Sequence, residues 1–353
     1  MKAKKQINTV VVTILILVGI FMVVILAAHK IKNPYIHFGK IYDYGNIFSI
    51  GIYIGDSPFH LHESKKIVNP VITASDVTDR DASFVADPFL IHANERWYLF
   101  FEVMDKKSKQ GDLGVAISDD TIKWKYQKII LDEPFHLSYP DVFSDGKDFY
   151  MIPETGATKS VRLYKAIDFP FKWKFEKTLL KGLRFVDPTI FKYHDKWWLF
   201  VETNPHTAGT LRLYYSDKIR GPWKEHPKSP IINGDANISR SGGRIELIND
   251  KLFRVAQDDW PTYGNAIRIF QVDRLTTSEY SEHELYNGSD YGCNGLIIES
   301  KNMNTKDELP KWRSEGMHQL DSHQISQNNW IACIDGKSKA KIGSHWVLDI
   351  RIP

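Results

Sequence analysis

The sequence predicts an all-β fold, a five-bladed β-propeller, because one hairpin pattern recurs along the chain. In its clearest copy, residues 185–202, two apolar strands flank the polar turn His194-Asp195-Lys196, with Asp187 and Glu202 at the outer ends of the strands. Similar hairpins begin near residues 87, 141, 242 and 318. Two further apolar stretches follow each of the first four hairpins, and four strands per unit are typical of a propeller blade.

The first 28 residues differ from the rest of the chain. Three lysines stand in residues 1–8, and residues 9–28 carry no charge. A helix of about twenty residues spans the roughly 30 Å apolar core of a bilayer. We expect a cytoplasmic basic tail (1–8) and a transmembrane helix (9–28), a signal anchor that is too long to resemble a cleaved signal peptide.

A linker (29–44) and the propeller (45–353) are expected to follow this anchor. The lysines of the tail predict a single-pass membrane protein whose propeller faces the periplasm or the cell exterior. The whole chain is 42% apolar and 25% charged with a net charge of +3, which gives no electrostatic case for a nucleic-acid partner. The two cysteines, Cys293 and Cys333, form either a disulfide or two free thiols.

The fifth hairpin lacks its outer strands, and the beginning of the propeller supplies a match for them. Residues 51–72 correspond to residues 211–232 in length, and both segments end in a proline followed by two apolar residues. We therefore expect N-terminal strands to complete the last blade, which would close the ring and remove an open sheet edge.

Acidic residues mark the ends of the repeated strands. In an antiparallel hairpin the first residue of one strand lies beside the last residue of its partner, so these acids should converge on one rim. The expected pairs are Asp87 with Glu102, Asp141 with Glu154, and Asp187 with Glu202. Clustered carboxyl groups shift one another's pKa values and suit acid–base chemistry. The alternative is that these acids accept backbone N–H groups and hold the blades together.

Other residues near this rim are candidates for substrate binding. Arg240 and Arg244 flank Gly242-Gly243 and would bind a phosphorylated or uronic sugar or a phosphate acceptor, or else pair with the rim acids. His318 opens the fifth hairpin, and Tyr139 is a possible platform for a sugar ring. The sequence predicts no metal site and no cofactor.

The Asp-Pro starts of the inner strands resemble the five-bladed glycosidase superfamily, especially the family forty-three arabinanases and xylosidases. The resemblance implies that Asp87 is the catalytic base, that Asp141 takes the second-blade position, and that Asp187 tunes the acid. The family's acid lies in a fourth-blade Glu-Gly-Pro, where this chain reads Ser241-Gly242-Gly243. Glu102, Glu154 and Glu202 remain as replacements for that acid.

A closer resemblance is to the propeller domain at the N-terminus of glucosamine inositolphosphorylceramide transferases. It rests on Ala-Asp-Pro, Tyr-Pro-Asp with Pro-Glu-Thr, Val-Asp-Pro with Val-Glu-Thr, and Arg-x-Gly-Gly-Arg. Because the chain ends after the expected propeller, transferase activity is not part of what the resemblance implies.

Two functions remain open. One is glycosidase-like cleavage or transfer of a glycosyl unit on a surface or envelope glycan or glycolipid. The other is glycan binding without catalysis, in support of a separate glycosyltransferase partner. The residues expected to be catalytic are Asp87, Asp141, Asp187, Glu154 and Glu202, and those expected to bind substrate are Glu102, Arg240, Arg244, His318 and Tyr139.

Overall fold

The computed structural model describes residues 36–41, 46–205, 209–259, 263–285, 297–299, 310–339 and 345–350. The expected anchor at residues 9–28 and one of the two cysteines, Cys293, lie outside this part. Among the residues that the structure describes, no helix has both the length and the apolar character needed to span a bilayer. Cys333 is a buried free thiol, and its Sγ lies 3.4 Å from the carbonyl oxygen of Pro88.

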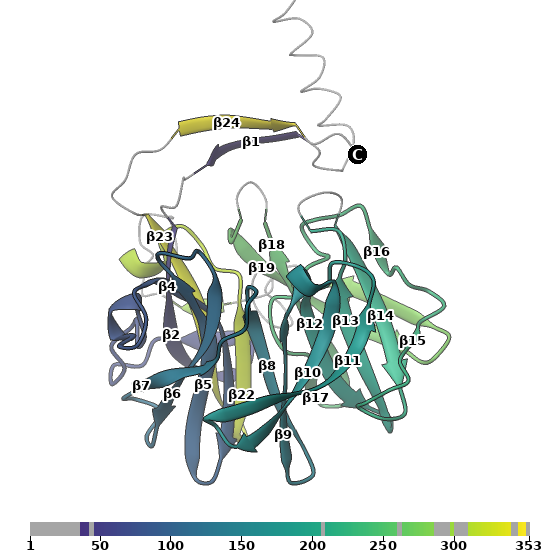
Figure 1. Ribbon diagram of the computed structural model, residues 1–353, viewed down its shortest axis with the longest axis horizontal. Coiled ribbons are helices and arrows are strands. Elements are labelled where there is room, and N and C mark those ends of the chain that lie inside the picture. Colours follow the sequence, from purple (N-terminus) through teal and green to yellow (C-terminus); the bar gives the residue numbers. More distant parts are fainter. Residues whose placement is uncertain are drawn as a thin grey trace, which may run out of the picture.

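The predicted all-β fold is confirmed as a five-bladed propeller (Figure 1). Four blades follow one another along the chain, each running outward from its inner strand. The first blade contains β4 (Ala82–Ala93), β5 (Arg96–Asp105), β6 (Gly111–Ser118) and β7 (Lys125–Leu131), and the second β8 (Ser138–Asp145), β9 (Asp148–Glu154), β10 (Ser160–Asp168) and β11 (Lys172–Lys181). The third contains β12 (Val186–Tyr193), β13 (Lys196–Glu202), β14 (Thr210–Ser216), β15 (Lys224–Glu225) and β16 (Ile232–Asn233), and the fourth β17 (Glu246–Ile248), β18 (Lys251–Asp258), β19 (Ala266–Leu275) and β20 (Tyr280–Glu284).

The fifth sheet combines strands from both ends of the chain. Its order is β21 (Ile297–Glu299), β3 (His60–His62), β2 (Asn46–Ser57), β23 (Asn329–Lys339) and β22 (Leu320–Ser326). The pairing of β2 with β23 is antiparallel and runs from Asn46↔Lys339 to Gly55↔Trp330. Two further strands, β1 (Ile36–Ile41) and β24 (His345–Ile350), pair with each other. Short 3-10 turns occupy Ala74–Asp76, Gly156–Thr158 and Lys311–Arg313.

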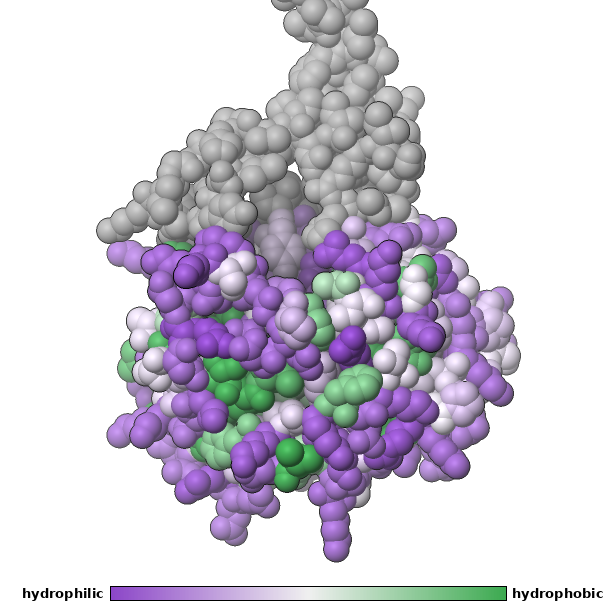
Figure 2. All heavy atoms as spheres, viewed as in Figure 1, coloured by the Kyte–Doolittle hydropathy of each residue, from purple (hydrophilic) through white to green (hydrophobic). Residues whose placement is uncertain are grey.

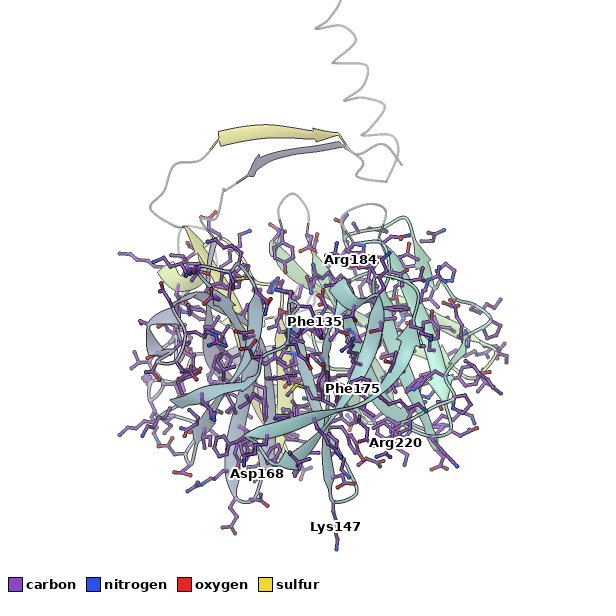
Figure 3. All side chains as sticks on the ribbon, viewed as in Figure 1. Phe135, Lys147, Asp168, Phe175, Arg184 and Arg220 are labelled. Carbon is purple, nitrogen blue, oxygen red and sulfur yellow. The ribbon has the colours of Figure 1, made fainter. Side chains whose placement is uncertain are left out.

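Two-residue turns with left-handed backbone connect the inner strand to the second strand in several blades. Asn94 and Glu95 have φ values of 50° and 61°, and His194 and Asp195 have values of 47° and 58°. Such turns match the twist of antiparallel strands and therefore fix the register of the hairpins. Figure 3 shows that Lys147, in the turn between β8 and β9, lies at the opposite end of the molecule from Arg184, which precedes β12. The inner strands thus begin at one end of the propeller and turn at the other.

The apolar core is divided among the interfaces between blades. Five clusters of buried side chains each draw on two neighbouring sheets. The cluster between the fifth and first blades, for example, joins Ile50, Ile52 and Ile331 to Leu90 and Leu99. The visible outer face is mainly hydrophilic (Figure 2). Each blade is therefore held by apolar contact with two others, and the acids at the strand starts sit on a rigid frame.

Candidate functional site

The first three inner strands share a bulge at the residue before a proline. Asp87, Tyr139 and Asp187 occupy this position with φ values of 52°, 47° and 45°. Left-handed backbone costs a non-glycine residue on the order of 1 kcal/mol or more, and such strain clusters at functional sites. The residue before the bulge pairs with a glutamate in each case, as in Ala86↔Glu102 and Val186↔Glu202.

This register changes the expected equivalence of the second blade. Because Asp141 pairs with Ile152 while Thr189 pairs with Phe200, Asp141 corresponds to Thr189. Tyr139 therefore stands where Asp87 and Asp187 stand in their blades.

Five acids from three blades come together next to these bulges. We call Asp87, Glu102, Glu154, Asp187 and Glu202 the rim carboxylates; all five are buried, with exposed fractions between 0% and 6%. Glu102 interacts electrostatically with Asp87, Glu154 and Asp187. The structure thus brings together five of the six acids that the hairpin pattern singled out.

Arg240 lies among the rim carboxylates and pairs with them. Its Nε donates to Asp187 Oδ2 at 2.5 Å, and its terminal nitrogen lies 3.7 Å from Glu154 Oε2. Gln257, the fourth-blade counterpart of the glutamates, also donates to Asp187 Oδ2, at 2.7 Å. Of the two roles left open for Arg240, the ion pair with rim acids is the one observed. Asp187 is consequently fixed by a charged and a neutral donor.

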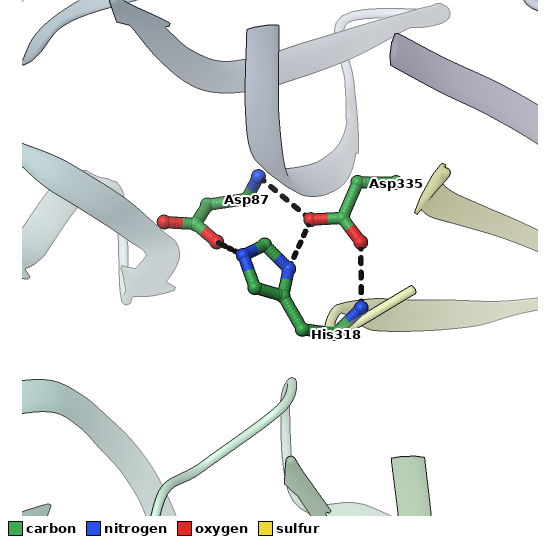
Figure 4. Close-up of side chains that lie close together, drawn as sticks. All are labelled: Asp87, His318 and Asp335. Carbon is green, nitrogen blue, oxygen red and sulfur yellow. Dashed lines mark hydrogen bonds and ion pairs between the residues drawn. The ribbon is translucent and has the colours of Figure 1, made fainter. Parts of the chain in front are cut away.

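His318 bridges two carboxylates (Figure 4). Its Nδ1 lies 2.5 Å from Asp335 Oδ2, and its Nε2 lies 3.8 Å from Asp87 Oδ1. Asp335 also accepts the backbone N–H groups of His318 and Asp87, at 2.9 and 3.2 Å. Phe48 stacks on the imidazole at a centroid distance of 4.7 Å. The ring is held in one orientation, with Nε2 directed at Asp87.

The pKa values of the rim carboxylates rise mainly because these groups are buried. Burial, opposed by His318 and reinforced by neighbouring acids, raises the pKa of Asp87 to about 7. Burial and the adjacent Asp187, with which Glu154 shares a hydrogen bond, raise the pKa of Glu154 to about 8. Burial raises the pKa of Glu202 to about 7 against the opposing charge of Arg240. The site therefore holds carboxyl groups that gain and lose protons near neutral pH, as acid–base chemistry requires.

The imidazole of His318 also has a raised pKa, but in its case the raised pKa favours the charged form. Burial alone would lower its pKa, but the carboxylates of Asp335 and Asp87 outweigh burial and raise the pKa to about 9. His318, Asp87 and Asp335 offer three ligand atoms within 4.8 Å of one another. However, the Nδ1 to Asp335 separation of 2.5 Å is a hydrogen-bond distance with no room for an ion. The arrangement suits an imidazolium better than a metal.

Asp141 and Arg244 belong to a different cluster. Arg244 Nε donates to Asp321 Oδ1 at 2.9 Å, and its other nitrogens donate to the carbonyl oxygens of Val142 and Leu90. Asp141 accepts the backbone N–H of Ile190 at 3.1 Å. These contacts connect the inner strands of different blades. For Asp141 and Arg244 the geometry favours a role in holding the blades together.

Tyr139 is packed inside the propeller. Its side chain is fully buried, its hydroxyl lies 2.8 Å from Thr189 Oγ1, and Phe89 packs edge-on against its ring. This burial rules out the expected use as a platform for a sugar ring in this conformation.

Some residues of the site escaped the sequence analysis. Asp335 occupies the position in its hairpin that the glutamates occupy in theirs, because Asp321 pairs with Cys333 as Asp141 pairs with Ile152. The repeat itself therefore contained the signal. Ser239, which donates to Glu202 Oε1 at 3.0 Å, and His136, which lies 3.6 Å from Glu102 Oε1, stand in connecting segments. No sequence pattern marks those two.

The raised pKa values predict how stability depends on pH. Asp87, Glu154 and Glu202 titrate in the native state near 7 to 8 instead of near 4, so the native state binds more protons than the unfolded state in this interval. The melting temperature should therefore fall as pH rises from about 5 to about 8. The raised pKa of His318 acts in the same direction. Differential scanning calorimetry measures the slope.

Variants of single acids check the origin of this slope. Glu154→Gln should flatten the slope and raise the melting temperature at pH 8, whereas Glu279→Gln, at an exposed ion pair with Arg274, should leave the slope unchanged. A melting temperature that stays constant or rises over this interval contradicts buried, protonated rim carboxylates.

Comparison with known proteins gives a consistent set of relatives. Residues 42–337 match the family described as "Glucosamine inositolphosphorylceramide transferase 1, N-terminal". Glucosamine inositolphosphorylceramide transferase 1 of Oryza sativa subsp. japonica is 33% identical over 314 residues, and that of Arabidopsis thaliana is 36% identical over 311 residues. Each alignment covers 82% of this chain but only 40% and 39% of the respective relative. The chain thus spans about two-fifths of the length of these relatives.

Solved glycosidase structures show weaker similarity. An exo-1,5-α-L-arabinanase from a bovine ruminal metagenomic library is 13% identical with a TM-score of 0.47, over 71% of this chain and 98% of its own. A β-xylosidase is 13% identical with a TM-score of 0.49, over 60% and 77% of the two chains. Likeness of this size carries no information about substrate.

Proposed function

The chain belongs to the family of the glucosamine inositolphosphorylceramide transferase 1 N-terminal domain, as its short motifs predicted, and on that premise we propose that its propeller binds a glycan at the rim carboxylates. There it cleaves a glycosidic bond or transfers a glycosyl unit by acid–base chemistry. The observation that carries this proposal is the convergence of buried carboxyl groups from three blades with two cations, Arg240 and His318. Asp87 faces the imidazolium of His318, and Glu154 holds a proton beside Asp187.

Each residue has a definite part in the proposed reaction. Asp87 takes the proton of a water or an acceptor hydroxyl while that oxygen bonds to the anomeric carbon. Glu154 gives its proton to the leaving oxygen as the glycosidic bond breaks. Asp187, fixed by Arg240 and Gln257, keeps Glu154 protonated until that step. Glu202 is the second candidate for the acid, since its pKa is also raised.

A second function is favoured by one departure from the glycosidase pattern. The fourth blade offers Gly242 and Gln257 where its counterparts carry acids. A propeller without turnover would hold a glycan or glycolipid for a separate glycosyltransferase. Incubating the purified protein with a glycan panel separates the two functions, because release or transfer of sugar supports the enzyme. Saturable binding without any product supports the binding module.

We also propose that residues 9–28 form an uncleaved membrane anchor and that the propeller lies outside the cytoplasm. The motivation is the uncharged stretch after a lysine-rich tail. Protease added to intact spheroplasts should digest the propeller while a cytoplasmic marker protein survives. Protection of the propeller until the membrane is broken would reverse this topology.

A last part of the proposal concerns how the ring is completed. Because β2 pairs with β23 along ten residue pairs, we propose that the N-terminal strands close the propeller by completing its fifth blade. Closure would leave β23 without a free edge and keep the strand starts, and with them the rim carboxylates, at fixed distances.

A further inference from the structure

His136, which immediately precedes the second blade, lies at the boundary between solvent and the buried rim carboxylates. Its Nε2 is 3.6 Å from Glu102 Oε1. The His136 side chain is 36% exposed, whereas that of Glu102 is 7% exposed. Glu102 Oε1 is buried and has no hydrogen-bond partner among the described residues. A polar atom in that state indicates a missing donor.

The tautomer of His136 follows from its backbone partner. The N–H of Gly111 points at His136 Nδ1 at 2.9 Å, so Nδ1 accepts and the ring proton is on Nε2. Burial lowers the pKa of His136, and Arg240 and Arg184 lower it further against the opposing charge of Asp187. The ring is therefore neutral and presents one N–H donor toward Glu102.

Gly111 makes this approach possible because it has no side chain. A Cβ at this position would lie 2.7 Å from Glu102 Oε1 and 2.8 Å from His136 Cε1. The carbonyl of Gly111 also accepts the N–H of Leu137 at 2.9 Å. Both backbone groups of Gly111 thus fix the segment that carries His136. Phe135, labelled in Figure 3, packs against Arg162, whose guanidinium carbon lies 4.8 Å from the centre of its ring.

We infer that His136 and Glu102 form a subsite for a sugar hydroxyl, which accepts the Nε2–H of His136 and donates to Oε1 of Glu102. This inference rests on the proposed glycan binding. A phosphate or carboxylate would accept from His136 but would have no proton for Glu102. An ammonium group would donate to Glu102 but could not accept from His136. A sugar hydroxyl satisfies both atoms with a single oxygen, as a water molecule does in the unliganded protein.

The first test needs no ligand. Nitrogen-15 NMR of the histidine rings at pH 7, with His136→Leu identifying the signal, should show the neutral Nε2–H tautomer for His136. The Nδ1–H tautomer would overturn the subsite because Nε2 would carry no proton to donate. A charged ring would overturn it as well, because Nδ1 could not accept the N–H of Gly111.

The second test measures binding of a fixed panel, the methyl glycosides of glucose, galactose, mannose, xylose and arabinose, by calorimetry. For each glycoside that binds, His136→Leu should weaken affinity by about tenfold, the usual effect of losing one hydrogen bond to a buried group. With the unmodified protein, one monodeoxy analogue should bind more weakly than its parent glycoside by a similar factor. With His136→Leu, the same analogue and its parent should bind with equal affinity. His92→Leu, at an exposed histidine of β4, is the matched control and should bind as the unmodified protein does.

The outcomes separate this inference from the proposed function. If the panel binds and His136→Leu has unchanged affinity, the subsite is wrong and glycan binding stands. If the unmodified protein binds no member of the panel, both are contradicted. If every deoxy analogue binds His136→Leu more weakly than its parent glycoside does, none of the removed hydroxyl groups contacts His136, and the subsite is wrong.

Discussion

Asp87→Asn should lower turnover of a responsive glycan by about 10² to 10⁴, the range expected when a general base is lost. The substitution keeps the shape of the side chain and removes its ability to take a proton. Asparagine tolerates the φ of 52° found at this position, so the fold and glycan binding should persist. Steady-state kinetics and calorimetric binding on the same preparation measure the two effects separately.

Two variants make this result specific. Asp195→Asn is a matched control, because it makes the same change at a similar φ of 58° in an exposed hairpin turn, and it should have unmodified activity. Glu154→Gln should also lose activity, but a substrate whose leaving group needs no proton should restore it. Equal turnover by Asp87→Asn and the unmodified protein would exclude Asp87 as the base and favour the binding module.

Deleting residues 46–72 should unfold the whole propeller. The segment contributes Ile50, Ile52 and Ile72 to one core cluster and Tyr53, Phe59 and Leu61 to the next. Each such buried side chain contributes about 1.5–3 kcal/mol, so their sum approaches or exceeds the roughly 5–15 kcal/mol by which domains are stable. Circular dichroism should show no cooperative thermal transition for the truncated protein.

A circular permutant supplies the control for this deletion. Because Asn46 and Lys339 are paired neighbours, residues 46–72 can be moved to follow residue 339 through a short turn, and this protein should fold and melt cooperatively. A truncated protein that melts like the full chain would contradict closure by the N-terminal strands.

The sequence was most informative where a local pattern also determines the long-range arrangement. Alternating apolar strands and two-residue turns predicted the hairpins, and the repeat placed Asp87, Asp187 and their glutamates on one rim. The second blade was misaligned by two residues, because the bulge before Pro140 puts Tyr139, and not Asp141, at the position of Asp87. Such a bulge depends on hydrogen-bond register, which residue types alone do not specify.

Contacts between distant residues were beyond the sequence. The pairing of Arg240 with Asp187 and of Arg244 with Asp321 depends on which blades meet at the axis. The contact of His318 with Asp87 also depends on which blades meet at the axis, because these two residues are more than two hundred positions apart in the chain. Only assembled blades show that these cations pair with acids.

A crystal structure of the protein soaked with a mixture of glycans tests the central claim most directly. The proposed function predicts a sugar among Asp87, Glu154 and Asp187, with its glycosidic oxygen within hydrogen-bond reach of Glu154. A sugar bound only on the outer surface of the blades, with the rim carboxylates contacting no ligand at saturating glycan, would contradict it.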